Sequence, residues 1–419
     1  MMASRSRTGV VGGLLLMGTL GTRTALAQAG GRIDLARMRP AGLLIDAYSY
    51  MTPPHSEYYF HHIDELGFRL GWVRRSGPTH SLPKAAGPAL KPHFQTAGTD
   101  VGLEEYFTRN RVAGLLVLRG DTVLLERYAF GADRRSRFVS QSVGKSVVSI
   151  LVGAAIAAGK ITSVNDPVTT YLPELVESGY RHVTIKQTLQ MATGVDYSED
   201  YRDSTSGAAR IGAALVAGRP AFDEFVRSMQ PTAVAPGTAF QYQSVNTQLL
   251  GMLIERVTGM TLAQWAEAAL WSKLGADRDA FFYQAKDQPG SCAFACFNAT
   301  LRDYGRLGLL MLNRGTIDGR QVVPASWVEA STAADADYLR PGAAGPFGYG
   351  YQWWIPPGSE GAFMAIGIFG QSIYVNPARH IVVVQTSAWS SPIGENGEGA
   401  DQLAMFEAIA AMSSRPNPR

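Results

Sequence analysis

The stretch FVSQSVGKSVVS, from Phe138 to Ser149, decides how the chain around it folds and what chemistry it can carry. Its Gly144-Lys145-Ser146 matches the tail of a phosphate-binding loop, whereas Ser142-Val-Gly-Lys145 matches a serine nucleophile followed by a lysine one helical turn later. A phosphate loop needs a glycine where this chain has Val139, because glycine lets the backbone wrap around phosphates. The sequence therefore favours the serine–lysine pair.

Lys145 is the only charged residue between Ser140 and Gly159, in a segment that is apolar nearly all round, as a buried helix is. A buried, unpaired ammonium is costly, so such a lysine tends to lose its proton or to find a strong partner. Residues three apart share a helix face, which lets Lys145 reach the Ser142 hydroxyl at the helix N-terminus. A hydroxyl, an amine and an oxyanion donor are the parts of acyl transfer. The alternative is a serine that caps the helix and a lysine that extends to solvent.

Spacing alone does not identify a nucleophile. The segment SLPK, Ser81 to Lys84, has the same Ser-x-x-Lys spacing. Pro83 is incompatible with a normal helix interior, and the neighbouring Pro- and Gly-rich sequence predicts an exposed segment. Ser81 is therefore not a candidate nucleophile.

A third catalytic group is expected to protonate the leaving group or to share the role of base. Tyr242-Gln243-Ser244 lies downstream, directly before a predicted helix. A phenol near an ammonium can have its pKa lowered and can serve as a proton shuttle. Without the pair at Ser142, the simpler interpretation is that Ser244 caps the helix and Tyr242 packs.

Composition limits the remaining classes of function. The chain has 419 residues, 46% hydrophobic and 17% charged, with a formal net charge of +3 and no basic run that would favour nucleic acid or an anionic membrane. The seven histidines show no ligand spacing, and two thiols alone make a poor zinc site, so we expect no metal and no other cofactor. Cys292 and Cys296 can form a disulfide in an oxidising compartment, but only across a loop or a broken turn.

The N-terminus predicts export from the cytoplasm. Two arginines precede an apolar run over 10–20, and Ala25-Leu26-Ala27 offers small residues at the positions that a signal peptidase reads. We expect a signal peptide over 1–27 and a periplasmic or secreted protein. The run is too short to span a membrane, and an N-terminal anchor is the alternative.

The pattern of apolar runs predicts how the chain is organised. An irregular extension is expected over 28–100, an α/β domain over 101–160 and 290–419, and a mainly helical domain over 161–289. A hairpin is expected around Gly120-Asp121, strands return from about 345, and an amphipathic helix closes the chain. The fold class is α+β, an antiparallel sheet flanked by helices with an inserted all-helical domain.

The chain resembles the serine β-lactamase and penicillin-recognising superfamily, in its class C-like esterase branch. The resemblance lies in the order and spacing of SVGKS, DPVTTYLPEL, VTIKQTLQMATGV, FQYQSVNTQLLGMLIERVTG, ATLRDYGRLGLLML and GQSIYVNP, between about 110 and 385. SEYYFHHIDELGF and EDYRD are further similar to the 6-aminohexanoate-dimer hydrolase subgroup.

The resemblance implies roles for individual residues. It implies Ser142 as the acylated nucleophile, Lys145 as base or base partner and Tyr242 as proton donor to the leaving group. The backbone N–H groups of Ser142 and of a residue near Ile368 would form the oxyanion hole. Two substrate-binding positions are implied as well, at Ser244 and Tyr201.

Two departures from the family pattern bear on the substrate. The Lys/His-Thr/Ser-Gly motif has no match, since 367–371 reads GIFGQ, which makes hydrolysis of β-lactams less favoured. The carboxylate that anchors a substrate amine in amide-cleaving relatives has no counterpart in GAARIGAALVAG. We therefore expect a serine hydrolase acting on carboxylic esters or small amides. The alternatives are a D-alanyl peptidase or β-lactamase, and a catalytically silent binding protein on the same fold, while the oligomeric state stays open.

Overall fold

The computed structural model describes residues 49–96, 98–284, 292–358 and 361–412. They belong to one compact unit, 47–419, and the expected signal peptide over 1–27 lies outside the described residues, as does the first part of the expected extension over 28–100. Within the described ranges, no helix has both the length and the apolar composition that crossing a membrane requires.

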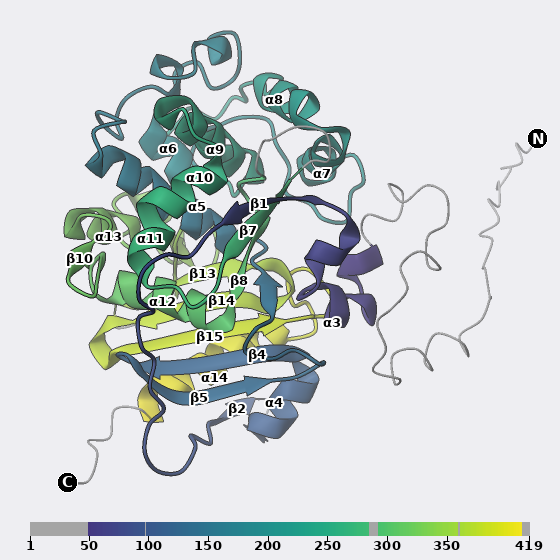
Figure 1. Cartoon of the computed structure of the whole chain (residues 1–419). Coiled ribbons are helices and arrows are strands. Elements are labelled where there is room, and N and C mark those ends of the chain that lie inside the picture. The colour runs from purple at the N-terminus through teal and green to yellow at the C-terminus, as the bar shows by residue number, and fades with distance from the viewer. Residues whose placement is uncertain (1–48, 97, 285–291, 359–360, 413–419) are drawn as a thin grey trace, which may run out of the picture. The chain divides into compact units, whose positions relative to one another are not determined.

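The main sheet has seven antiparallel strands in the order β11-β12-β13-β14-β15-β4-β5 (Figure 1). The strands are β4 (Val112–Arg119), β5 (Thr122–Tyr128), β11 (Gly348–Tyr349), β12 (Trp354–Ile355), β13 (Phe363–Gly367), β14 (Gln371–Asn376) and β15 (Ile381–Ser387). The hairpin expected around Gly120-Asp121 is the β4–β5 hairpin, and Gly120 takes the left-handed φ of 52° that its tight turn requires.

Helices cover both faces of this sheet. Helices α5 (Val143–Ala157) and α12 (Leu301–Leu312) lie on one face, and α4 (Leu103–Arg109) and α14 (Glu398–Met412) on the other. Side chains alternate along each strand, so Val382 packs toward α12 while Val383 packs toward α14. A Cβ on Gly308 would lie 2.4 Å from Val382 Cγ1, so the glycine lets α12 lie close to the sheet.

A smaller antiparallel sheet fixes where the two inner helices begin. Its order is β1-β7-β8-β6, with β1 (Arg69–Val73), β7 (Ala280–Gln284), β8 (Phe297–Thr300) and β6 (Arg137–Val139). Strand β6 leads into α5 through a short turn, and β8 runs directly into α12. The N-terminal ends of α5 and α12 are therefore tied to neighbouring strands.

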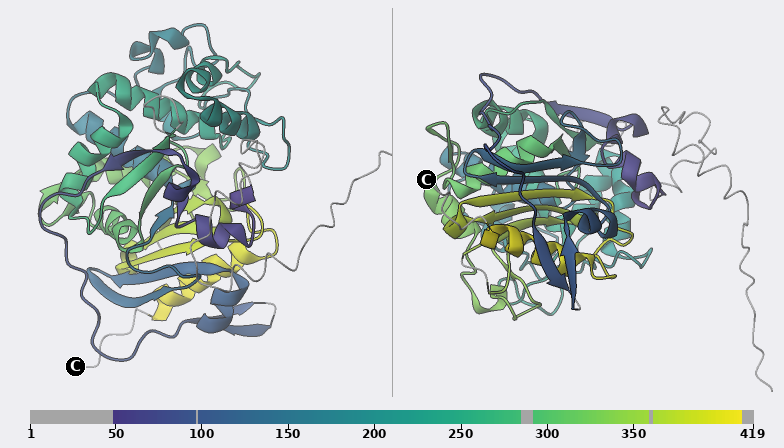
Figure 2. Two further views of the ribbon diagram at one scale, coloured as in Figure 1. Left: turned by 45° about the vertical axis from the view of Figure 1, so that its right-hand side comes forward. Right: turned by 90° about the horizontal axis from the view of Figure 1, so that it is seen from below.

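Shorter elements complete the unit (Figure 2). Toward the N-terminus they are η1 (Ser49–Met51), α3 (His55–Tyr59), η2 (Ile63–Leu66), β2 (His93–Thr96) and β3 (Thr99–Gly102). The middle of the chain forms η3 (Val168–Thr170), η4 (Pro173–Leu175), α6 (Ile185–Leu189), α7 (Gly207–Ala217), α8 (Arg219–Arg227), α9 (Ser244–Thr258), α10 (Leu262–Ala266), η5 (Glu267–Trp271) and α11 (Ser272–Leu274). Later elements are β9 (Thr316–Ile317), β10 (Arg320–Gln321), α13 (Ala325–Ser331), η6 (Asp337–Leu339), η7 (Ile368–Gly370) and η8 (Pro377–Arg379).

The expected domain boundaries stay a prediction. The segments 101–160 and 290–419 both supply strands to the seven-stranded sheet. The segment 161–289 is mainly helical, but its last strand, β7, joins the smaller sheet.

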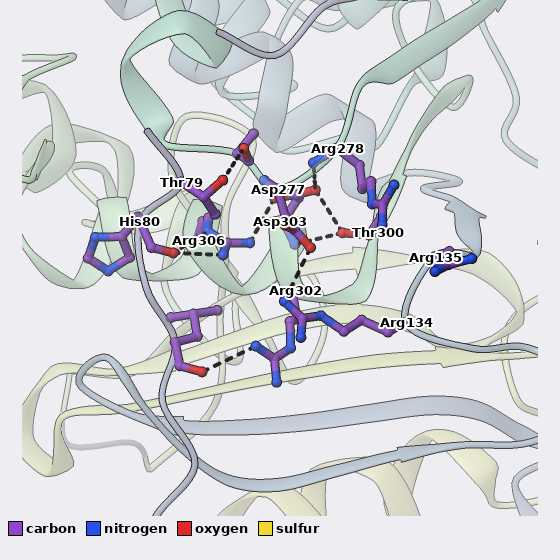
Figure 3. Close-up of polar contacts among 12 residues, drawn as sticks. Thr79, His80, Arg134, Arg135, Asp277, Arg278, Thr300, Arg302, Asp303 and Arg306 are labelled. Carbon is purple, nitrogen blue, oxygen red and sulfur yellow. Dashed lines mark hydrogen bonds and ion pairs between the residues drawn. The ribbon is translucent and has the colours of Figure 1, made fainter. Parts of the chain in front are cut away.

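The first two turns of α12 carry a buried ion pair that connects the helix to two distant segments (Figure 3). Asp303 and Arg306 are 0% and 1% exposed, and the guanidinium donates to the carboxylate at 2.9 Å. Arg306 also donates twice to the His80 carbonyl, at 3.1 and 2.7 Å, and Asp303 accepts from the backbone N–H groups of Asp277 and Arg278. Both buried charges are therefore paired and hydrogen-bonded.

Candidate active site

Ser142 lies in the tight turn between β6 and α5. Gln141, just before it, has a φ of 44°, a left-handed conformation that is costly for a residue with a side chain. The turn is held in place because Ser140 donates from its backbone N–H to the Phe297 carbonyl at 2.7 Å and from its hydroxyl to the Ala295 carbonyl at 3.1 Å. The strand partner β8 thus fixes the position of Ser142.

The Ser142 hydroxyl pairs with Lys145 and makes no hydrogen bond that would cap α5. The distance between Lys145 Nζ and Ser142 Oγ is 2.7 Å, and the amine also donates to the Phe294 carbonyl at 3.1 Å. Lys145 is 1% exposed, so the alternative of a capping serine with a solvated lysine is wrong. The other Ser-x-x-Lys segment is different, since Ser81 and Lys84 are exposed and outside any helix.

Burial sets the charge state of Lys145. Desolvation lowers the pKa of the amine to about 8, and the negative charge of Glu199 acts in the opposite direction. The two direct acceptors, a hydroxyl and a carbonyl, carry no formal charge. A substantial fraction of the amine is therefore neutral near physiological pH and able to accept a proton.

Tyr242 lies beside this pair. Its ring centroid is 5.0 Å from Lys145 Nζ, and its ring stacks on Trp354 with centroids 5.2 Å apart. Burial and the charge of Glu199 raise the pKa of the Tyr242 hydroxyl, and a hydrogen bond with Ser142 lowers it only in part. The expectation of a lowered pKa was wrong, because burial of the phenol and the charge of Glu199 both raise the pKa. The phenol therefore keeps its proton at neutral pH.

Glu199 is a residue of this site that sequence reasoning missed. Its carboxylate accepts from the Ser244 backbone N–H at 2.7 Å, from the Ser244 hydroxyl at 2.5 Å and from the Tyr201 hydroxyl at 2.8 Å. The carboxylate thus meets the N-terminus of α9, where negative charge is favourable. Glu199 stands in the same SEDY segment as Tyr201, but nothing in that segment indicates contact with a helix 45 residues away.

Ser244 and Tyr201 therefore meet at one carboxylate. Ser244 is 3% exposed and hydrogen-bonded to Glu199, whereas Tyr201 is 38% exposed. Of the two positions implied as substrate-binding, Tyr201 is the accessible one.

Ile368 follows the last residue of β13, beside the nucleophile turn. A Cβ built on Gly367 would lie 3.0 Å from the Ser142 backbone nitrogen and 2.7 Å from the Ser140 carbonyl oxygen. Glycine is therefore required for this close approach, which brings the start of η7 to the backbone N–H of Ser142. The structure thus places the two segments of the expected oxyanion hole next to each other.

Two further expectations concern cysteines and metals. Cys292 and Cys296 form a disulfide across a turn, 293–295. The sequence spacing allowed this bond only across a loop or a broken turn, and the structure has such a turn. Among the residues that the structure describes, no group of three or more His, Cys, Asp or Glu side chains could hold a metal ion.

Comparison with known proteins places the chain in a family. A family model described as Beta-lactamase matches residues 103–405. A 6-aminohexanoate-dimer hydrolase of Paenarthrobacter ureafaciens is 32% identical over 379 residues, which cover 87% of this chain and 94% of that protein. Esterase EstB of Burkholderia gladioli is 29% identical over 210 residues, covering 46% of this chain and 53% of that protein. The chain belongs to the beta-lactamase family.

A solved structure, "Putative 6-aminohexanoate-dimer hydrolase from Bacillus anthracis", superimposes with a TM-score of 0.78 at 23% identity, covering 88% of this chain and 97% of that one. The expected β-lactamase/transpeptidase-like fold and the resemblance to the superfamily are confirmed. The expectation of an enzyme of the hydrolase class is confirmed as well, since the curated relatives are named hydrolases. The roles of Ser142, Lys145 and Tyr242 stay predictions.

Proposed function

We propose that the protein hydrolyses carboxylic esters or small amides through an acyl-enzyme formed on Ser142. The observation that carries this proposal is the 2.7 Å contact between Ser142 Oγ and the buried Lys145 amine, whose pKa is lowered to about 8. A hydroxyl beside a neutral amine is an activated nucleophile.

In the acylation step, the Ser142 proton passes to Lys145 Nζ while Oγ bonds to the substrate carbonyl carbon. The carbonyl oxygen becomes an oxyanion, and the backbone N–H groups of Ser142 and Ile368 stabilise it. The bond to the leaving group then breaks as Tyr242 gives its proton to the departing oxygen or nitrogen, and Lys145 returns a proton to the phenolate. Water attacks the acyl-enzyme by the same route and releases the acid.

Lys145 is the proposed base, and Tyr242 the proposed acid. The two pKa shifts support this division, because burial lowers the pKa of the amine and raises that of the phenol. A base that is about half neutral near pH 8 and an acid that keeps its proton at that pH suit their tasks.

The substrate class follows from the charges at the site. No lysine or histidine stands in 367–371, where the family motif would supply a cation for the carboxylate of a β-lactam. The half-buried Glu199 adds negative charge instead, which disfavours anionic substrates. The two curated relatives, named a 6-aminohexanoate-dimer hydrolase and an esterase, support amides and esters as substrates.

Parallel assays with p-nitrophenyl butyrate and with a fluorescent penicillin test this proposal. We expect turnover of the ester without stable labelling by the penicillin, loss of turnover in Ser142→Ala and full turnover in Ser81→Ala, the exposed serine with the same spacing. Rapid labelling by the penicillin would favour a D-alanyl peptidase or β-lactamase. Unchanged ester turnover in Ser142→Ala would contradict the assignment of the nucleophile.

We also propose that the protein is exported, with 1–27 as a signal peptide and the periplasm or the medium as its location. The disulfide between Cys292 and Cys296 supports an oxidising compartment. N-terminal sequencing of the protein from its native host is expected to start at Gln28. An intact Met1 in the mature protein would contradict export by cleavage.

A further inference from the structure

The Cys292–Cys296 disulfide closes a turn that lies against the catalytic pair. Both cysteines are almost completely buried, at 0% and 1% exposure, and Cys296 directly precedes β8. Between them stand Ala293, Phe294 and Ala295, which form the turn. The covalent bond therefore constrains three residues at the edge of the candidate active site.

Two of the three residues within the disulfide ring contact the candidate site, and the third contacts α9. The Phe294 carbonyl accepts from Lys145 Nζ at 3.1 Å, and the Phe294 ring centroid is 5.6 Å from the same nitrogen. The Ala295 carbonyl accepts from the Ser140 hydroxyl, two residues before the nucleophile, at 3.1 Å. The Ala293 backbone N–H donates to Gln248 of α9 at 2.9 Å.

The Phe294 carbonyl has a specific consequence for a lysine that acts as a base. A neutral amine has two N–H donors and one lone pair, so an acceptor that takes one N–H limits where the lone pair points. With Nζ held between Phe294 O and Ser142 Oγ, the lone pair can be directed at the serine proton. If the carbonyl moved, Lys145 would lose this constraint, while the hydrogen bond from the Ser140 backbone N–H to Phe297 of β8 would still hold the nucleophile turn.

We propose that the Cys292–Cys296 disulfide is a positioning element of the active site, which holds the Phe294 carbonyl where it orients the Lys145 amine toward Ser142. This inference rests on the proposed function, because it needs Lys145 as the base. The cysteines themselves touch no reacting atom, and they act through the turn that they close.

The proposal predicts a kinetic signature that a purely structural disulfide would not give. Loss of orientation lowers kcat, on the order of tenfold to a hundredfold, while KM changes little because the contact that is lost is the one to Lys145. A carbonyl acceptor also favours the protonated amine, so its loss moves the acidic limb of the pH–rate profile to lower pH. Glu199 and Tyr242, the other titratable groups that face Lys145, are left in place.

The test compares the wild type with Cys292→Ala/Cys296→Ala and with Cys292→Ser/Cys296→Ser. Steady-state kinetics with p-nitrophenyl butyrate are measured from pH 6 to 10, well below the Tm of each protein, with circular dichroism as a check on folding. We expect both double variants to show the lowered kcat, a KM within about twofold of the wild-type value and the shifted acidic limb. Double variants that lose Tm but keep the wild-type kcat and profile would overturn the proposal.

Chemical reduction provides a second measurement if the variants fold poorly. Dithiothreitol opens the bond by a two-electron transfer that yields two thiols and its own cyclic disulfide, and mass spectrometry confirms the gain of two hydrogens. Since the chain has only two cysteines, any loss of kcat on reduction is due to this bond, and a double variant treated alike is the control. A reduced wild type with unchanged kcat contradicts the proposal, whereas activity that survives in Ser142→Ala contradicts the proposed function instead.

Discussion

Two cationic side chains are buried in this protein to the same extent, and they differ in their partners. Lys145 in α5 and Arg306 in α12 are each 1% exposed, and each meets a residue three positions earlier on its helix. Arg306 faces the carboxylate of Asp303, whereas Lys145 faces the hydroxyl of Ser142. The same spacing of three residues thus gives the cation a charged partner in α12 and an uncharged one at the start of α5.

The difference separates a structural charge from a chemical one. The Arg306 guanidinium gives two further hydrogen bonds to the His80 carbonyl, and it stays protonated under all ordinary conditions. Among the residues that the structure describes, no carboxylate is bound directly to Lys145, and burial brings its pKa to about 8. Arg306, with its bound carboxylate, therefore holds α12 to neighbouring segments. Lys145, without one, can exchange a proton near neutral pH.

Replacing each of the two cations by methionine is expected to separate their roles most clearly, because one substitution should affect catalysis and the other stability. Lys145→Met removes the proposed base, so we expect kcat for p-nitrophenyl butyrate to fall on the order of 10²- to 10⁴-fold. Stability is expected to stay the same or to rise, because a desolvated amine is removed and the apolar methionine side chain, one heavy atom shorter, fills most of its place. Steady-state kinetics and urea unfolding on the same sample check both results. A Lys145→Met variant that unfolds more easily and keeps its kcat would show that Lys145 has a structural role and is not the base.

Arg306→Met is expected to act in the opposite sense. It leaves the Asp303 carboxylate buried without its counter-charge, which costs about 3–5 kcal/mol of the free energy of unfolding. Ester turnover per folded molecule should stay at the wild-type level, since the hydrogen bonds of Arg306 go to Asp303 and His80 and not to the catalytic pair. Urea unfolding measures the loss, and Asp303→Asn combined with Arg306→Met should recover part of it. An Arg306→Met variant with the wild-type free energy of unfolding would show that this ion pair does not stabilise the fold.

The Lys145 amine should also make stability depend on pH. Its pKa is about 8 in the folded protein against 10.5 for an ordinary lysine, so the unfolded chain binds more protons between these values. Below about pH 8 the full penalty is present, at about 3 kcal/mol, and it disappears as pH rises toward 10.5. The unfolding free energies of the wild type and Lys145→Met should therefore converge at high pH. Parallel curves from pH 7 to 11 would contradict the lowered pKa.

The smallest expected effect concerns Glu199, which acts on Lys145 from a distance. Its charge raises the pKa of the amine, so Glu199→Gln should move the acidic limb of the pH–rate profile to lower pH while an oxygen remains to accept from Ser244. Asp200→Asn, at the exposed carboxylate next in the chain, is the matched control and should leave the limb in place. An equal shift in both variants would indicate a general effect of net charge.

The main elements of the fold and the central pair could be predicted from local sequence. The uncharged stretch around Lys145 indicated a buried helix, and Gly120-Asp121 indicated a hairpin, because periodicity and turn chemistry act within a few residues. The remaining parts of the site depend on contacts between distant segments. Glu199 meets Ser244 across 45 residues, and the Phe294 carbonyl meets Lys145 across 149. No local pattern marks such contacts, since tertiary packing alone brings these groups together.

The charge state of Lys145 is the central claim, and NMR titration of its side chain tests it most directly. The protein is labelled with ¹³C at lysine Cε, and the Lys145 signal is assigned by its absence in Lys145→Met. A midpoint near pH 8 is the result that the buried, neutral surroundings of the amine predict. A midpoint at or above 10.5, the ordinary value for lysine, would show a permanent ammonium and would contradict its role as the base that activates Ser142.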